Sequence, residues 1–166
     1  KIIERLLIEA ENLQRAGLEY SSQTSGTLTV ATTHTQARYV LPEVVQTFRV
    51  AFPDVRIALQ QSAPEHIAEW VLSGKTDIGI ATEGLSQFPD LVSFPCYSWS
   101  HQIVVPHGHP LLSQASVSLT DLAAYPLITY DIGFTGRSHI DAAFSNAGVK
   151  TNIVLTAMDS DVIKQY

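Results

Sequence analysis

The spacing of apolar residues changes along this chain, and each change predicts a different element. At the start the apolar residues recur every three or four positions, which predicts an amphipathic helix; they are Ile3, Leu6, Ala10, Leu13 and Tyr20. This pattern lasts for about three heptads, so it is equally typical of a coiled-coil linker and of an amphipathic helix that lies on its own domain. A polar run at residues 21–26 follows it.

After Gly26, short apolar runs alternate with segments of helical periodicity. Strands are predicted at 28–31, 55–60 and 77–81, and helices at 36–52 and 62–72. Pro42 marks a kink or a restart in the first of these helices. Ser62 is predicted to cap the second helix, with Glu65 completing a capping box, and Gly74 ends it. Right-handed crossovers would place the three strands in one parallel sheet.

A second α/β unit is expected from Cys96 onward. Its predicted strands lie at 102–105, 126–130 and 152–157, and its predicted helices at 119–124, at 138–147 and from residue 159. The expected division is a linker helix at 1–25, a first lobe at 26–95 and a second lobe at 96–166. Because the pattern stops within a helix that has barely begun, we expect the natural chain to continue.

Polar residues follow all three strands of the first unit. Thr33, Thr35 and Gln36 follow the first strand, and Thr82 follows the third. Ser62 follows the second strand, although its predicted role as a helix cap is enough to explain it. The carboxyl ends of parallel strands meet at one edge of the sheet, so these residues should converge in a single crevice. Helix N–H groups at such an edge lack partners and attract anions. A capping box formed by Thr33 and Gln36 would explain part of the pattern equally well.

Thr135 occupies the equivalent place in the second unit. It lies between Gly133 and Gly136, at a predicted junction of strand and helix, and the two glycines would allow a ligand to approach the backbone closely. This threonine therefore either faces the first cluster across a cleft between two lobes or is an incidental residue of a glycine-rich turn.

Composition excludes several classes of protein. With 166 residues and 45% hydrophobic content the chain can bury the core of one or two small domains. It has no run of about 18 apolar residues and no visible signal peptide. Its net charge of −6 argues against binding of a nucleic-acid phosphate backbone over a broad surface of this chain. Cys96, the one cysteine, is expected to be a buried small side chain.

The motifs of common enzymes are missing. His101, His107 and His109 lie in or near a Pro-Gly-Pro turn without a carboxylate at ligand spacing, so they indicate a metal site only weakly. The sequence has no nucleophile elbow, no dinucleotide fingerprint and no P-loop lysine. We therefore expect a protein that is not an enzyme and that needs neither a cofactor nor a metal.

Several runs of sequence together resemble LysR-type transcriptional regulators. Within that family they are most similar to the sulfur-assimilation branch, whose members are CysB-like and Cbl-like. The runs cover residues 31–39, 41–42, 52–53, 77–83, 126–130, 133–138 and 159–164. The resemblance implies an α/β fold of two Rossmann-like lobes, as in periplasmic binding proteins, preceded by a linker helix. It also implies an N-terminal winged helix-turn-helix that binds DNA, outside this chain.

The resemblance further implies an effector site in the cleft between the lobes. Matching motif positions place that site at Thr33, Thr35, Gln36, Thr82 and Thr135. The family's effectors include sulfate, thiosulfate, acetylserine compounds and adenosine phosphosulfate. A cytoplasmic homodimer or homotetramer that controls cysteine biosynthesis genes would follow, with no membrane partner. The alternative is an extracytoplasmic solute-binding protein for an oxyanion, which would share the two-lobed design.

Overall fold

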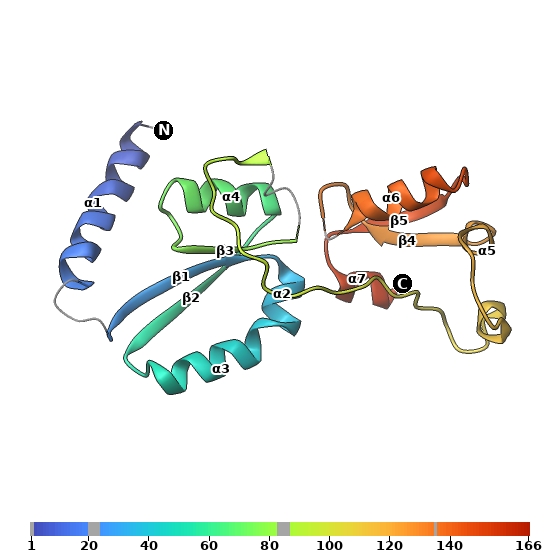
Figure 1. Ribbon diagram of the computed structural model, residues 1–166, viewed down its shortest axis with the longest axis horizontal. Coiled ribbons are helices and arrows are strands. Elements are labelled where there is room, and N and C mark those ends of the chain that lie inside the picture. The colour runs from blue at the N-terminus through green and yellow to red at the C-terminus, as the bar shows by residue number, and fades with distance from the viewer. Residues whose placement is uncertain (1, 20–23, 83–86, 135) are drawn as a thin grey trace. The chain divides into compact units, whose positions relative to one another are not determined.

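The computed structural model describes residues 2–19, 24–82, 87–134 and 136–166. Contacts between Cα atoms divide the chain into two compact units, residues 1–92 and 93–166, which are described separately below. Both units contain parallel strands joined by helices, as Figure 1 shows, so the predicted α/β class is confirmed. None of the described helices is long and apolar enough to cross a membrane.

The first unit is built on a three-stranded parallel sheet. Its strands are β1 (Gly26–Thr32), β2 (Val55–Gln61) and β3 (Ile78–Ile80), in the order β2-β1-β3. At the last residue of β1, Thr32 lies opposite Gln61 on one side and Ile80 on the other. Asp77 fixes the entry to β3, because its Oδ2 accepts from Thr29 N at 2.7 Å while its own N–H donates to Thr29 O at 2.9 Å.

Two helices stand where one was predicted between β1 and β2. They are α2 (His34–Tyr39) and α3 (Leu41–Ala51), and they are separated by Val40. Pro42 lies in the first turn of α3, where its missing N–H would have had no partner in the helix. The prediction of a restart at Pro42 is therefore confirmed.

Helix α4 (Pro64–Leu72) begins one residue later than the predicted capping box requires. Ala63 takes the N-cap position, and no side chain caps the helix there. Ser62 is thus too far from the first turn, and its hydroxyl is hydrogen-bonded to His66 Nδ1 at 3.3 Å instead. The prediction that Ser62 caps this helix was wrong.

Gly79 lets α4 pack directly on the sheet. A Cβ atom at this position of β3 would lie 2.8 Å from Ile67 Cγ2 and 2.9 Å from Val71 Cγ2. Ile67 and Ala68 are fully buried in the contact. A glycine in a strand allows this close approach of a neighbouring element.

The apolar stripe of α1 (Ile2–Glu19) is largely uncovered. Ile3, Leu6 and Leu13 are 73%, 63% and 77% exposed. The helix instead turns Asn12 toward the first unit, where Asn12 Nδ2 lies 2.6 Å from the place that a Cβ of Gly74 would take. Tyr20, which was predicted to continue the stripe, lies outside the described residues. The helix thus touches its own unit with a polar residue and leaves the apolar stripe free to pack on another surface.

The second unit contains two parallel strands, β4 (Pro126–Tyr130) and β5 (Asn152–Ala157). Around them lie the 3-10 helix η2 (Pro110–Ser113) and the helices α5 (Leu119–Ala123), α6 (Arg137–Asn146) and α7 (Ser160–Gln165). Leu111, Leu122 and Phe144 form the buried core. Ser118 and Asp121 form a capping box on α5, and the hydroxyl and N–H groups of Ser118 lower the pKa of Asp121 by bonding to its carboxylate.

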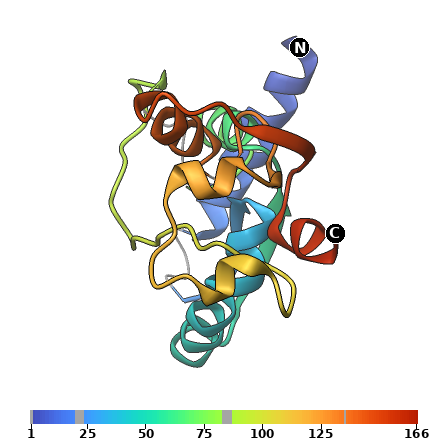
Figure 2. The ribbon, with the colours of Figure 1, turned by 90° about the vertical axis from the view of Figure 1, so that its right-hand side faces the viewer.

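The strand predicted at 102–105 is absent from the part of the chain that the structure describes. Residues 93–105 have neither helix nor strand hydrogen bonding and form the yellow-green extended segment in Figure 2. Because no described strand pairs with this segment, most of its apolar side chains stay at the surface, Phe94, Ile103 and Val104 among them, and only Val105 packs against the core. Cys96 is accordingly exposed, and its Sγ donates to Phe94 O at 3.6 Å. The prediction that Cys96 is buried was also wrong.

Two adjacent leucines of η2 test where the core of the second unit lies. Leu111 is 5% exposed and Leu112 is 61% exposed. Leu111→Ala should lower the free energy of unfolding by about 2–5 kcal/mol, because it leaves a cavity in the core. The control Leu112→Ala should change it by less than about 0.5 kcal/mol. Urea unfolding followed by circular dichroism measures both; equal losses would place the core elsewhere.

Candidate functional site

The carboxyl ends of three strands gather at one edge of the first unit. Because Thr32 is level with Gln61 and Ile80, the chain leaves the sheet at Thr33, at Ser62 and just before Thr82 along the same edge. Four of the five predicted effector residues follow these strand ends, namely Thr33, Thr35, Gln36 and Thr82. The fifth, Thr135, lies outside the described residues.

Thr33 and Gln36 form a buried pair at the start of α2. They are 4% and 0% exposed, and Thr35 between them is 7% exposed. Thr33 occupies the N-cap position with extended backbone, but its side chain makes no capping bond. The predicted capping box is therefore wrong. The Thr33 hydroxyl donates to Gln36 Oε1 instead, which fixes the orientation of the buried amide.

Two polar atoms at this edge are buried without a partner among the described residues. They are Gln36 Nε2 and Thr82 Oγ1. Because Thr33 occupies Oε1, the Gln36 amide has its two N–H donors left over. A buried polar group without a partner costs about 1–3 kcal/mol, so native proteins seldom retain one without a reason. Both groups can donate to an acceptor atom of a bound ligand.

The edge is lined by neutral donors. Its residues 32–36, 61–62 and 80–82 include no lysine, arginine or carboxylate. His34 begins α2, and its Nδ1 lies 3.2 Å from Gln61 Oε1. Amide, hydroxyl and backbone N–H donors held in a fixed arrangement bind oxyanions without a counter-charge in several protein folds. The arrangement suits a ligand that presents several oxygen acceptors.

The second unit has a comparable edge. Residues 131–136 follow β4, and Asp131 N donates to Ala157 O at the end of β5 at 2.9 Å. Ser160, at the start of α7, has a buried hydroxyl without a partner among the described residues. We did not predict Ser160 as a site residue. It lies three residues after a predicted strand, at the start of a predicted helix, and the same kind of position singled out Thr33 and Thr35, so it could have drawn attention to Ser160.

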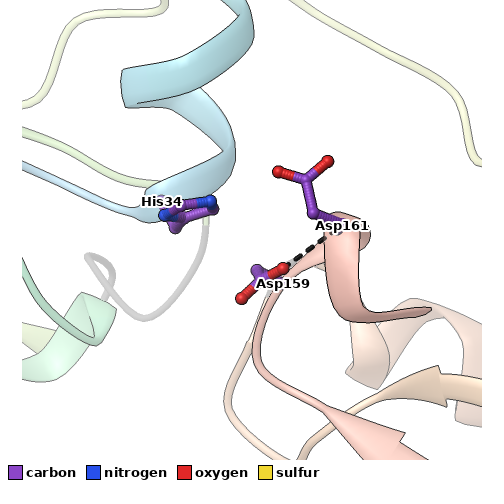
Figure 3. A group of neighbouring side chains, drawn as sticks. All are labelled: His34, Asp159 and Asp161. Atoms are coloured by element: carbon purple, nitrogen blue, oxygen red, sulfur yellow. Dashed lines mark hydrogen bonds between the residues drawn. The ribbon is translucent and has the colours of Figure 1, made fainter. Parts of the chain in front are cut away.

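Asp159 is the N-cap of α7. Its Oδ1 accepts from Asp161 N at 2.9 Å and from Val162 N at 3.0 Å, and the first of these bonds is the dashed line in Figure 3. Figure 3 also draws His34 at the start of α2. The aspartate supplies acceptors for otherwise unpaired N–H groups, as an N-cap residue does.

His109 has a structural role that its sequence context did not reveal. Its Nδ1 accepts from Leu111 N at 3.3 Å and caps η2, while its ring packs against Tyr125 with centroids 4.6 Å apart and ring planes tilted by 58°. His101 and His107 are exposed. The cap and the ring contact explain the histidine of this turn without a metal.

Comparison with known proteins identifies the family. Residues 21–166 match the model of the LysR substrate binding domain. The chain is 55% identical over 166 residues to the HTH-type transcriptional regulator SsuR of Burkholderia cenocepacia, covering 100% of this chain and 54% of that protein. It is 53% identical over 165 residues to the HTH-type transcriptional regulator cbl of Escherichia coli, covering 99% and 52%. The HTH-type transcriptional regulator CysB of Burkholderia cenocepacia is 49% identical over 164 residues, with coverage of 99% and 52%.

Solved structures agree with this assignment. The cofactor-binding domain of the Cbl transcriptional regulator matches with a TM-score of 0.84 at 55% identity, covering 86% of this chain and 63% of that one. The effector binding domain of QuiR in complex with shikimate shares the fold, with a TM-score of 0.76 at 23% identity and coverage of 84% and 67%. The predicted fold of two Rossmann-like lobes is thereby confirmed.

The relatives also bear on the predicted class of protein. The chain spans about half the length of the curated relatives named above. They are transcriptional regulators, which confirms the prediction that this chain is not an enzyme and leaves the solute-binding alternative without support. The resemblance to CysB-like and Cbl-like proteins is confirmed as well. The chain belongs to the LysR family of transcriptional regulators and consists largely of that family's substrate binding domain.

Proposed function

We propose that this chain senses a sulfur-containing effector and thereby controls genes of sulfur assimilation and cysteine biosynthesis. Its similarity to SsuR, cbl and CysB supports the sulfur-related role. The observation that carries the proposal is a pair of buried donors at one edge of a parallel sheet, Gln36 Nε2 and Thr82 Oγ1, which have no partner within the part of the chain that the structure describes. A bound oxyanion would give both donors the acceptor that they lack.

The effector in this proposal is sulfate or a metabolite that carries a sulfate-like group. A tetrahedral anion offers oxygens in several directions, so separate donors from Thr35, Gln36 and Thr82 can each bond to a different one. The neutral lining of the edge limits its affinity for positively charged or purely apolar ligands. The proposed site is the cleft between the two lobes, with Thr33, Thr35, Gln36 and Thr82 from one and Thr135 from the other.

Regulation follows from a difference in effector affinity between two states of the protein. An effector that binds one arrangement of the lobes more tightly shifts the population toward it. In this proposal the shift reaches DNA through an N-terminal winged helix-turn-helix, in a cytoplasmic homodimer or homotetramer joined in part through α1. The proposed division into a linker at 1–25 and lobes at 26–95 and 96–166 corresponds to these roles.

Titration of the full-length protein tests the ligand and the site together. Calorimetry with sulfate, thiosulfate, O-acetylserine, N-acetylserine and adenosine phosphosulfate should reveal binding of at least one. Thr82→Val and Thr35→Val should then each weaken that binding by about 1.5–3 kcal/mol, because each loses a donor to a charged group. Unchanged affinity in both variants would contradict the site, and no binding of any compound would contradict the sulfur-sensing function.

Thr76 provides a matched control for Thr82. Its Oγ1 is also buried without a partner among the described residues, but it lies before the amino end of β3, whereas Thr82 follows the carboxyl end. Thr76→Val should leave effector affinity unchanged. Neither valine variant should lose stability without ligand, since each removes an unsatisfied hydroxyl. A marked loss of thermal stability in Thr82→Val would assign that hydroxyl a structural partner.

The uncovered stripe of α1 leads to a separate prediction about assembly. Leu6→Asp combined with Leu13→Asp should shift the full-length protein toward monomer in sedimentation velocity, because two carboxylates cannot be buried in an apolar helix contact.

Gln14→Asp, which adds a charge at an exposed polar position beside the stripe, serves as the control and should leave the oligomer intact. If the double variant sediments like the wild type, the stripe does not hold subunits together.

A further inference from the structure

Arg137 joins three parts of the second unit. It is the first residue of α6, directly after residues 131–136, which follow β4. Its Nη1 donates to Tyr130 O, at the end of β4, at 2.6 Å. Its Nε donates to Asp141 Oδ1, one turn further along α6, at 2.8 Å. One guanidinium therefore ties the end of the strand to the start of the helix that follows it.

This arginine stands where a cation is electrostatically unfavourable. The N-terminal end of a helix carries partial positive charge, so basic residues are preferred at the other end. The Arg137 side chain is also only 12% exposed, which removes most of its hydration. Asp141 and the Tyr130 carbonyl compensate for both costs. An arginine with a solvated side chain would need neither partner. The buried position of Arg137 therefore indicates that its bonds to Tyr130 O and Asp141 serve to connect β4 with α6.

The connection links the two ends of residues 131–136, the stretch of sequence that includes Thr135. Phe134 N donates to Asp131 O at 3.1 Å, and Arg137 N donates to Phe134 O at 2.9 Å. Gly133 and Gly136, on either side of Thr135, have φ angles of 84° and 79°, in the left-handed region that glycine adopts readily. A turn with two glycines has much conformational freedom in the unfolded chain, and the guanidinium adds a fixed closure between its ends.

We propose that Arg137 is a positioning residue for effector binding, because its guanidinium ties the end of β4 to the start of α6 on the two sides of residues 131–136, the stretch of sequence that includes Thr135. The inference rests on the proposed function, in which Thr135 is an effector contact. Arg137 acts through the turn, since its Nε and Nη1 are directed to Asp141 and Tyr130. Lysine cannot replace it, because a single ammonium group lacks the planar fork that reaches both partners.

A double-mutant cycle in the full-length protein distinguishes positioning from the alternatives. Sulfate and, in parallel, adenosine phosphosulfate are titrated into the wild type, Arg137→Lys, Thr135→Val and the double variant. Arg137→Lys should weaken binding by about 5-fold or more in the wild-type background. In the Thr135→Val background it should weaken binding by less than about 2-fold, because residues that act as one unit are not additive.

Two further variants serve as controls. Lys164 is another cation of the second unit, and its Nζ lies 4.0 Å from Asp161 Oδ1 on the same helix. Lys164→Gln should leave the affinity unchanged. Asp141→Asn keeps the bond from Arg137 to Tyr130 O, so it should weaken binding less than Arg137→Lys does. Hydrogen exchange of the amides of Asp131, Phe134 and Arg137 should quicken in Arg137→Lys, while exchange in β5 stays unchanged.

The possible results separate this inference from the proposed function. If Thr35→Val and Thr82→Val weaken binding but the effects of Arg137→Lys and Thr135→Val are additive, Arg137 does not position Thr135. The same conclusion follows if Thr135→Val has no effect, or if exchange at residues 131–137 does not change. If instead Thr35→Val and Thr82→Val leave affinity unchanged, the proposed site itself is wrong, while faster exchange in Arg137→Lys would still show that the guanidinium holds the turn.

Discussion

Parallel pairing of β1 with a strand on each side is the constraint on which the candidate site depends. Parallel neighbours must be joined by crossovers, so every strand of the sheet runs in the same direction and ends at the same edge. Residues that are about 50 positions apart in the sequence, such as Thr33 and Thr82, are thereby brought to one edge. Asp77 helps to set this alignment, because its two hydrogen bonds to Thr29 fix where β3 begins beside β1.

The same edge departs from the usual rule that buried polar groups have partners. The Thr33 hydroxyl donates to the carbonyl oxygen of the Gln36 amide. The Nε2 group of the same amide is buried and has no partner among the described residues. Among the described residues, folding leaves Gln36 Nε2 and Thr82 Oγ1 without a partner, and in the proposed function a bound acceptor supplies the missing bonds. The proposed preference for oxyanions has this origin, because a ligand that lacks suitable oxygens cannot restore those bonds.

The second unit uses a charged residue for a comparable purpose. Its strand-to-helix turn contains two glycines in the left-handed conformation, and Arg137 closes that turn from a position that the helix dipole disfavours. In the first unit a buried hydroxyl orients an amide; in the second a guanidinium connects a strand to a helix. Both arrangements restrain groups close to the strand ends.

Hydrophobic periodicity and turn residues determined most of the elements, because those signals are local. They identified five of the strands, the break at Pro42 and the positions of Thr33, Thr35, Gln36 and Thr82 after strand ends. Tertiary structure decided what depends on a partner. The apolar run at 102–105 found no neighbouring strand, so Cys96 is exposed, and the Thr33 side chain bonded to an amide instead of a helix N–H. Which polar atoms remain unpaired, and that Arg137 reaches Tyr130, depends on distances between atoms that a sequence pattern does not contain.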